Sequence, residues 1–250
     1  MDLFNIKGKV VMVTGGNRGL GQEMVKGYAQ AGANIAIVDL EIDEEMVSKI
    51  EELGVECKGY RFNLLDFHKY NGLIDEIVAD FGTIDILLNN AGIQKRHPAV
   101  EFPKRDWDLV MDVNCNAVFF MCQQVGKIFI EKGYGKIINL ASMLSFQGGF
   151  TVPAYASSKS AVMGFTKSLS NEWAGLGIQV NCIAPGYMDT EMNTAIKNDE
   201  QRNKQILDRI PAARWGTPQD LVGTALYLSS SASDYVSGYT IAVDGGWLGR

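Results

Sequence analysis

Residues 9–21, KVVMVTGGNRGLG, decide the fold, because an apolar run ends there in a glycine-rich turn that leads into a helix-period stretch. Glycine lets the backbone approach a bound pyrophosphate closely, and the amides at the start of the following helix hold its charge. Gly15, Gly19 and Gly21 are spaced Gly-x-x-x-Gly-x-Gly, whereas the commoner fingerprint is Gly-x-Gly-x-x-Gly, so the likeness is one of mechanism. The stretch predicts a strand, a nucleotide-binding turn and a helix, with a tight turn that binds nothing as the alternative.

Apolar runs and helix-period stretches alternate along nearly the whole chain. We expect strands at 9–15, 34–40, 57–64, 85–92, 136–142, 178–186 and 239–246, and helices at 20–31, 43–53, 66–81, 104–132 and 153–175. The strand runs are continuously apolar, which is typical of parallel sheets covered on both faces. The alternation predicts an α/β fold: a single-domain, Rossmann-type, doubly wound parallel sheet of about seven strands flanked by helices. Ligands bind such a sheet at the carboxyl ends of its strands.

One irregular region interrupts this alternation, at residues 187–218. The segment is charged and turn-rich and lies between the last two expected strands. Long irregular segments of this kind commonly cover active sites. We therefore expect residues 1–250 to form one domain in which residues 187–218 are a lid-like insertion.

Composition excludes several classes of function. Hydrophobic residues make up 46% of the chain and charged residues 21%, which is ordinary for a globular protein with a sizeable core. The net charge of −6 repels phosphate backbones, so no nucleic acid partner is expected. The chain has no apolar run of about 18 residues and no leader-like start, so we expect no membrane segment and a cytoplasmic address. Four cysteines without a Cys-x-x-Cys pair, and two histidines, predict buried reduced thiols and no metal site.

Asp39 ends the second expected strand, 18 residues after Gly21. An acidic residue near this spacing accepts hydrogen bonds from the adenosine ribose hydroxyls of NAD and repels the 2′-phosphate of NADP. Arg18, in the glycine turn, favours the opposite choice, because a cation there could reach a 2′-phosphate. Since Asp39 competes for the ribose hydroxyls themselves, NAD is the predicted cofactor and NADP the less favoured one.

Three polar residues indicate acid/base chemistry. Ser142 closes the fifth expected strand, and Tyr155 and Lys159 stand four residues apart at the start of the following helix. Residues at this spacing share a helix face, so the ammonium can lie beside the phenol and lower its pKa. Taken alone, Tyr-x-x-x-Lys is more often a solvated surface pair. In combination with Ser142, the glycine turn and Asp39, it predicts a catalytic set.

Six motifs follow one another in order over the whole chain: Thr14–Gly21, Asn89–Gly92, Asn114, Ser142, Tyr155–Lys159 and Pro185–Gly186. Together they resemble the short-chain dehydrogenase/reductase family. The resemblance implies that Tyr155 is the general acid/base and that Ser142 holds the substrate carbonyl or hydroxyl. It also implies that Lys159 binds the nicotinamide ribose and depresses the pKa of Tyr155, and that Asn114 holds a water in a proton relay.

The resemblance also implies a cofactor site built from residues throughout the chain. These are Gly15, Asn17, Arg18, Gly19, Leu20, Gly21, Asp39, Asn63, Leu64, Asn90, Ala91, Gly92, Tyr155, Lys159, Pro185, Gly186, Met188 and Thr190. Asn63 is a departure, because many family members have an aspartate there to accept from the adenine amino group. The asparagine carbonyl can still accept that bond, so we expect a weaker adenine contact.

Residues 136–149, 184–190, 205–216 and 233–247 are similar to a narrower group of sugar-acid dehydrogenases. This resemblance implies an NADH-linked homotetramer that interconverts 2-keto-3-deoxygluconate and its 2,5-diketo form during uronate breakdown. A gluconate 5-dehydrogenase, or another carbonyl reductase, is the alternative within the family, because many substrates share the fold and catalytic set. A catalytically silent NAD-binding scaffold is the alternative outside enzymes.

Three residues are candidates for binding the acid itself, in addition to Ser142 and Tyr155. Arg96 lies in the loop after the fourth expected strand, where its guanidinium could pair with a carboxylate. A solvated basic loop is an equally favoured interpretation. Gln147 and Tyr187 are candidate partners for substrate hydroxyls.

Overall fold

Seven parallel strands form the sheet of the computed structural model, which describes residues 2–250. The strands are β1 (Val10–Thr14), β2 (Asn34–Asp39), β3 (Cys57–Arg61), β4 (Ile86–Asn89), β5 (Gly135–Leu140), β6 (Ile178–Pro185) and β7 (Thr240–Val243). Their order in the sheet is β3-β2-β1-β4-β5-β6-β7. The chain leaves β1 toward one edge through β2 and β3 and returns beside β1 as β4, so the order reverses between β1 and β4. The carboxyl ends of these two strands mark the crevice where such sheets bind ligands.

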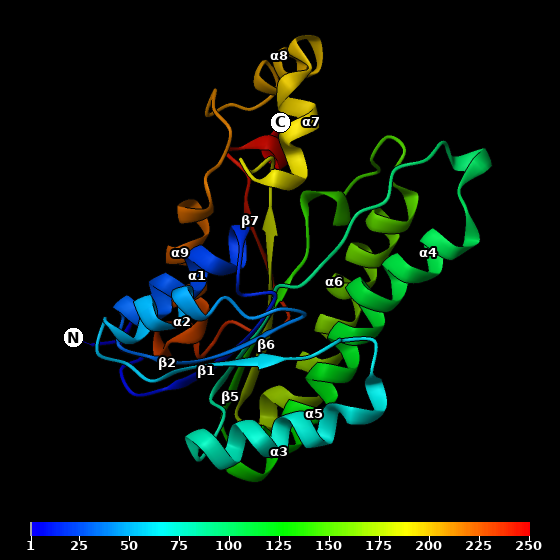
Figure 1. The fold of residues 1–250 in the computed structure, drawn as a ribbon. Helices are drawn as coiled ribbons and strands as arrows, with labels where there is room; N and C mark the ends of the chain where they lie inside the picture. The colour runs from blue at the N-terminus through cyan, green and yellow to red at the C-terminus, as the bar shows by residue number, and fades with distance from the viewer. Residues whose placement is uncertain (1) are drawn as a thin grey trace.

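Helices cover both faces of the sheet (Figure 1). They are α1 (Gly19–Gln30), α2 (Glu44–Glu51), α3 (Tyr70–Phe81), α4 (Lys104–Met111), α5 (Ala117–Lys132), α6 (Pro153–Trp173), α7 (Thr194–Asn198), α8 (Glu200–Leu207) and α9 (Val222–Ser229). Residues of α1, α2 and α9 pack on one face, and residues of α3, α5 and α6 on the other. The expected single-domain doubly wound fold is confirmed.

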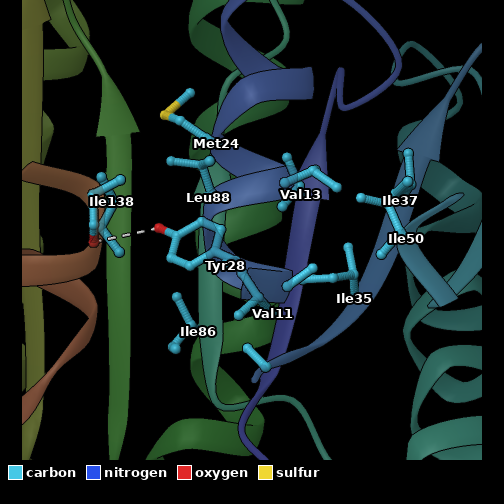
Figure 2. Packing of buried hydrophobic residues seen from close by; sticks show 14 of the residues in the cluster. Val11, Val13, Met24, Tyr28, Ile35, Ile37, Ile50, Ile86, Leu88 and Ile138 are labelled. Atoms are coloured by element: carbon cyan, nitrogen blue, oxygen red, sulfur yellow. Dashed lines mark hydrogen bonds between the residues drawn. The ribbon is translucent and has the colours of Figure 1, made fainter. Parts of the chain in front are cut away.

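Alternate side chains of each inner strand enter different cores. Val11 and Val13 of β1 pack in the core beneath α1, whereas Met12 packs in the core of the opposite face. Figure 2 shows Tyr28 of α1 among the strand side chains of the first core, including Ile86. Its buried hydroxyl lies 2.9 Å from Ser229 Oγ at the end of α9, which joins these two helices. Because both faces are apolar, the strands need continuous rather than alternating hydrophobic sequence.

The structure corrects several expected boundaries. β3 ends at Arg61, three residues before the predicted end at Leu64. The predicted helix 104–132 consists of α4 and α5 joined by a π-helical turn, Asp112–Asn116. Segment 187–218, expected to be irregular, contains the short helices α7 and α8, and α9 follows as a further unpredicted helix. In Figure 1, α7 and α8 project beyond the carboxyl ends of the strands.

Within residues 2–250, no helix is long and apolar enough to cross a membrane. In the same range, no three His, Cys, Asp or Glu side chains are grouped so that they could hold a metal ion. Cys57, Cys122 and Cys182 are buried free thiols, as predicted, whereas Cys115 is partly exposed.

Candidate active site

The glycine turn between β1 and α1 is hydrogen-bonded to the end of β4. Asn90 Nδ2 donates to Gly15 O at 2.7 Å and to Thr14 O at 3.2 Å. The Thr14 hydroxyl accepts from the backbone amides of Asn90 and Ala91, both at 3.2 Å. A Cβ on Gly21 would lie 2.1 Å from Gly15 O, so only glycine fits there. These contacts place the motifs 14–21 and 89–92 together across the β1/β4 crevice.

The start of α1 fits a pyrophosphate. Gly19 has φ +57°, and a Cβ added to it would meet no atom within 4 Å, so the turn faces open space. The first turn of α1 carries no acidic side chain, and its N-cap residue, Arg18, forms no side-chain capping bond. The free amides and the helix dipole therefore remain available to an anion.

Asp39 lies at the carboxyl end of β2 and organises the same turn. Its Oδ2 accepts from the Asn17 amide at 3.2 Å, and its Oδ1 accepts from the Leu40 amide at 2.8 Å. Asn17 Nδ2 also donates to Glu41 O, while its buried Oδ1 has no partner among the described residues. A ribose hydroxyl is a group that could satisfy such an orphaned acceptor.

Asn63 and Leu64 lie beyond β3, in a turn and not in the strand where we expected them. Asn63 is exposed, and its Oδ1 accepts from the Leu65 amide at 3.0 Å. The Asn63 Oδ1 atom, which was expected to accept from the adenine amino group, is therefore already hydrogen-bonded within a local turn. Its second lone pair is what remains for a ligand.

Ser142 and Tyr155 meet where β5 and α6 approach one another. Ser142 caps a short 3-10 turn, Met143–Ser145: its Oγ accepts from the Leu144 amide at 3.1 Å, and its own amide donates to Ser145 Oγ at 3.2 Å. Pro153 in the first turn of α6 helps to start the helix that carries Tyr155. Burial raises the pKa of Tyr155, and a hydrogen bond with Ser142 opposes that rise. Ser142 and Tyr155, each predicted to act on the substrate oxygen, are thus brought together.

Lys159 is buried beneath Tyr155. Its Nζ donates to Leu140 O at 2.6 Å and lies 5.9 Å from the centroid of the Tyr155 ring. Desolvation lowers the pKa of the ammonium to about 8. The sequence led us to expect that Lys159 depresses the pKa of Tyr155, but in this structure the pKa of Tyr155 is raised and Lys159 is not among the causes. The reason is that the ammonium faces the Leu140 carbonyl.

Asn114 lies in the π-helical turn and is fully buried. Its Nδ2 donates to Ile93 O at 2.8 Å and to Ser158 Oγ at 3.3 Å, and its Oδ1 accepts from the Ile93 amide at 2.8 Å. A Cβ on Gly92 would lie 3.4 Å from Asn114 Oδ1 and 3.6 Å from Lys159 Nζ. The side chain therefore ties the loop after β4 to α6 and lies beside the lysine. Both of its donor hydrogens are already used.

The expected nicotinamide-end residues follow β6. Pro185 is the last residue of that strand, and a Cβ on Gly186 would lie 2.6 Å from Asp244 Cα. Met188 is buried, and its backbone carbonyl accepts from Asn193 Nδ2 at 2.8 Å; Thr190 is partly exposed and precedes a 3-10 turn. A cavity of about 310 Å³ adjoins Met188 beneath segment 187–218, but neither Ser142 nor Tyr155 lines it.

Three further residues, Arg96, Gln147 and Tyr187, were predicted to bind the substrate. Arg96 forms no ion pair within residues 2–250, and burial lowers the pKa of its guanidinium. Gln147 Oε1 accepts from Arg209 at 3.2 Å, so the residue expected to bind a substrate hydroxyl contacts the chain just after α8. Tyr187 packs edge-on between Trp215 and Trp247, with ring centroids 5.4 and 4.9 Å away. Both tryptophans are buried packing residues of segment 187–218 and the C-terminus.

Some residues of the site were missed by the sequence analysis. Thr14 was visible as the last residue of the first strand, but only the fold shows its bonds to residues 90 and 91. Ser145 connects the Ser142 turn to the helix through a 2.7 Å hydrogen bond to Lys159 O.

Comparisons with known proteins agree with this arrangement. A family model described as Enoyl-(Acyl carrier protein) reductase matches residues 15–248. A 2-dehydro-3-deoxy-D-gluconate 5-dehydrogenase of Dickeya dadantii (strain 3937) is 53% identical over 251 residues, covering 100% of this chain and 99% of the relative.

Two solved structures are similar over their full length. One is a putative 2-deoxy-d-gluconate 3-dehydrogenase from Agrobacterium tumefaciens with bound NADP, which has a TM-score of 0.93 and 45% identity and covers 100% of both chains. The other is a gluconate 5-dehydrogenase from Burkholderia cenocepacia J2315 in complex with NADP and tartrate, which has a TM-score of 0.95 and 39% identity and covers 100% of this chain and 98% of that one. The chain belongs to the short-chain dehydrogenase/reductase family.

Proposed function

We propose that the protein is an NAD-dependent dehydrogenase that interconverts 2-dehydro-3-deoxy-D-gluconate and 2,5-didehydro-3-deoxy-D-gluconate. The observation that carries the proposal is the meeting of Ser142 and Tyr155, close enough for Ser142 to lower the Tyr155 pKa, with the buried Lys159 beneath them, at the strand ends that also carry the glycine turn. The substrate follows from the 53% identical relative, which is a 2-dehydro-3-deoxy-D-gluconate 5-dehydrogenase.

In the reductive direction Tyr155 donates its phenolic proton to the substrate oxygen, and Ser142 holds that oxygen by a hydrogen bond. A nicotinamide cofactor, when bound, would supply the hydride. The ammonium of Lys159, 5.9 Å from the Tyr155 ring centroid, is assigned to stabilise the phenolate left on Tyr155, for which it would have to turn from the Leu140 carbonyl. Because burial brings the pKa of Lys159 to about 8, this lysine exchanges protons readily near neutral pH and can restore the tyrosine. Asn114, held beside Lys159, is assigned to keep a water in that relay.

The cofactor proposal is NAD. The glycine turn and the start of α1 would hold the pyrophosphate, and Asp39 would accept from the ribose hydroxyls. Glu41 and Glu44 line a hollow at the end of β2 and add negative charge where a 2′-phosphate would lie. Arg61 lines the same hollow, but its Nε is engaged with Leu40 O at 3.1 Å. Two relatives have been solved with NADP bound, so the preference of this enzyme between NADH and NADPH is the measurement that tests the proposal.

Segment 187–218 is proposed to act as the lid. Its apolar underside, formed by Ile206, Ile210 and Trp215, packs against Met143, the residue after Ser142. Closing this segment would exclude water from the reacting carbon. By resemblance to the family we also propose a cytoplasmic homotetramer, for which sedimentation equilibrium of the purified protein is the direct test of assembly.

The test of function is NADH oxidation on a panel of keto acids. We expect the highest kcat/KM for 2,5-didehydro-3-deoxy-D-gluconate, with 5-keto-D-gluconate as the principal competitor. Higher turnover of 5-keto-D-gluconate would favour the second candidate, a gluconate 5-dehydrogenase, which the 39% identical Burkholderia enzyme supports. Lack of turnover of every keto acid, with NADH still bound, would indicate a silent scaffold.

A further inference from the structure

Two arginines on different segments lie near the candidate substrate site without a counter-ion. Arg96 belongs to the loop after β4, and Arg202 belongs to α8 in segment 187–218. In the part of the chain that the structure describes, neither guanidinium forms an ion pair or a hydrogen bond. By contrast, Lys204 on the same helix pairs with Asp208 at 2.6 Å, and Arg214 pairs with Asp220 at 2.7 Å.

The two arginines are close enough to affect one another. Burial is the main cause that lowers the pKa of Arg96; nearby Tyr187 raises this pKa, and the positive charge of Arg202 lowers it again. Like charges held together without a counter-ion are unfavourable, and an anion between them removes the repulsion. This arrangement is typical of an anion site rather than of a stabilising surface network.

Packing brings α8 and the loop after β4 to the same place. The guanidinium of Arg202 lies 5.6 Å from the centroid of the Phe150 ring, in the loop between the two catalytic hydroxyls. The amide of His97, next to Arg96, donates to Thr151 O in that loop at 3.0 Å. The guanidinium of Arg202 therefore lies over one residue of this loop, and the backbone next to the exposed Arg96 is hydrogen-bonded to the following residue.

We propose that Arg202 and Arg96 together bind the carboxylate of the substrate. This inference rests on the proposed function, because it takes a sugar acid as the substrate. A carboxylate has two oxygens and can accept from two guanidinium groups at once, and each such bond is charge-assisted. Segment 187–218 then contributes to specificity directly, because a neutral sugar would leave the two arginines facing one another.

The experiment compares Arg202→Ala with wild-type enzyme on the acid and on its methyl ester. We expect kcat/KM for the acid to fall by about 10- to 100-fold, mainly through KM, since a charge-assisted bond to a carboxylate is lost. Turnover of the ester should change by less than about 3-fold, which is within the spread of surface substitutions. Arg202→Lys should recover part of the loss, because it keeps the charge but not the planar fork.

Lys204→Ala is the matched control. It removes a positive charge from the same helix, but the lysine is exposed and paired with Asp208, so both substrates should keep their wild-type kinetics. A parallel loss on the acid and the ester in Arg202→Ala would overturn the proposal and leave Arg202 as a packing residue on Phe150. Unchanged kinetics on both would overturn it equally.

A binding measurement separates this inference from the proposed function. Tartrate, a hydroxy dicarboxylate, serves as the probe, and its affinity is measured by calorimetry in the presence of NADH. We expect Arg202→Ala and Arg96→Ala each to weaken binding by about 10-fold or more. The double variant should lose much less than the product of the two effects, because both side chains hold one group. Equal tartrate affinity in wild type and Arg202→Ala would refute the two-arginine carboxylate site, whichever sugar acid is the substrate of this enzyme.

Discussion

The chemistry assigned to Tyr155 resides in one oxygen atom. Burial raises the pKa of the phenol more than the hydrogen bond with Ser142 lowers it, so the group is protonated at neutral pH. That state is the one required for donating a proton in reduction. The oxidative direction instead needs the phenolate, which alkaline pH and a nearby ammonium favour.

Replacing Tyr155 with phenylalanine tests this role. The ring remains and only the hydroxyl is lost, so we expect kcat to fall by about 100- to 10,000-fold while NADH affinity changes little. Steady-state kinetics and fluorescence titration with NADH measure the two quantities on the same preparation. A parallel loss of NADH binding and turnover would mean that the hydroxyl supports the cofactor site and not proton transfer.

Asp39 is the residue on which the cofactor choice depends. We expect the wild-type enzyme to prefer NADH, and Asp39→Ala to narrow the preference by about 1–3 kcal/mol as the like-charge neighbour of a 2′-phosphate is removed. The cofactor preference is measured as the ratio of kcat/KM with NADH to kcat/KM with NADPH, for the wild type and for the variant. Equal use of both cofactors by the wild-type enzyme would show that Arg18 outweighs Asp39.

Asp39→Asn is the control that isolates charge from structure. The carboxylate accepts from the amides of Asn17 and Leu40, so alanine also loosens the glycine turn. Asparagine keeps one acceptor oxygen in place and removes the charge. If only alanine changed the preference, the cause would be the turn and not electrostatic repulsion.

At the scale of the elements, the inner strands could be predicted because helices cover both of their faces. A strand such as β1 is apolar at every position, and such a run, bounded by a glycine turn, has few other stable places in a fold. Strand ends were less certain, as β3 shows. Cys57–Arg61 is partly exposed, and the polar residues that follow it carry no mark that distinguishes strand from turn.

The helices of segment 187–218 could not be predicted in the same way. α8 is strongly polar and buries only Ile206, so its sequence has little of the apolar periodicity that marks a helix. The chain just after it is held by a residue far away in the sequence, through the 3.2 Å hydrogen bond between Arg209 and Gln147. The π-helical turn at Asn114 is a similar case, since its side chain is fixed by the loop after β4.

The residues of the candidate site likewise fall into two groups, those predictable from local sequence and those positioned by distant segments. Tyr155 and Lys159 were predictable because a spacing of four residues puts both side chains on one face of a helix. The glycine turn was predictable because its backbone conformation depends only on neighbouring residues. The direction in which the Lys159 ammonium points could not be predicted, because it depends on the Leu140 carbonyl of a neighbouring strand. Arg202 could not be identified from sequence at all, since no local pattern links it to Arg96.

For the molecule as a whole, several exposed ion-paired carboxylates contribute to the dependence of stability on acidic pH. Hydrogen bonds from Lys69, Lys58 and Arg214 hold the pKa values of Asp66, Asp80 and Asp220, respectively, below the usual range. A carboxylate whose pKa is depressed by folding stabilises the native state above its unfolded-state pKa of about 4. That contribution is lost as the pH falls through the lower, folded-state value. We therefore expect an approximately constant Tm between about pH 5 and 7 and a decline below about pH 4.

Asp220→Asn tests this dependence at the base of segment 187–218. Asp220 accepts two bonds from Arg214, at 2.7 and 2.8 Å, and one from the Thr217 amide at 2.7 Å. At pH 7 and fixed protein concentration we expect the variant to melt about 2–4 °C below wild type, the shift that about 1 kcal/mol produces in a chain of this length. The difference should begin to shrink below about pH 4, because Asp220 of the unfolded wild-type chain then takes up a proton while the folded protein, with its depressed pKa, keeps the carboxylate ionised. Glu191→Gln, which removes an exposed carboxylate without an ion pair in the described chain, should match wild type at every pH. A Tm difference for Asp220→Asn that stayed constant from pH 7 to 3 would show that the loss comes from packing and not from the charge.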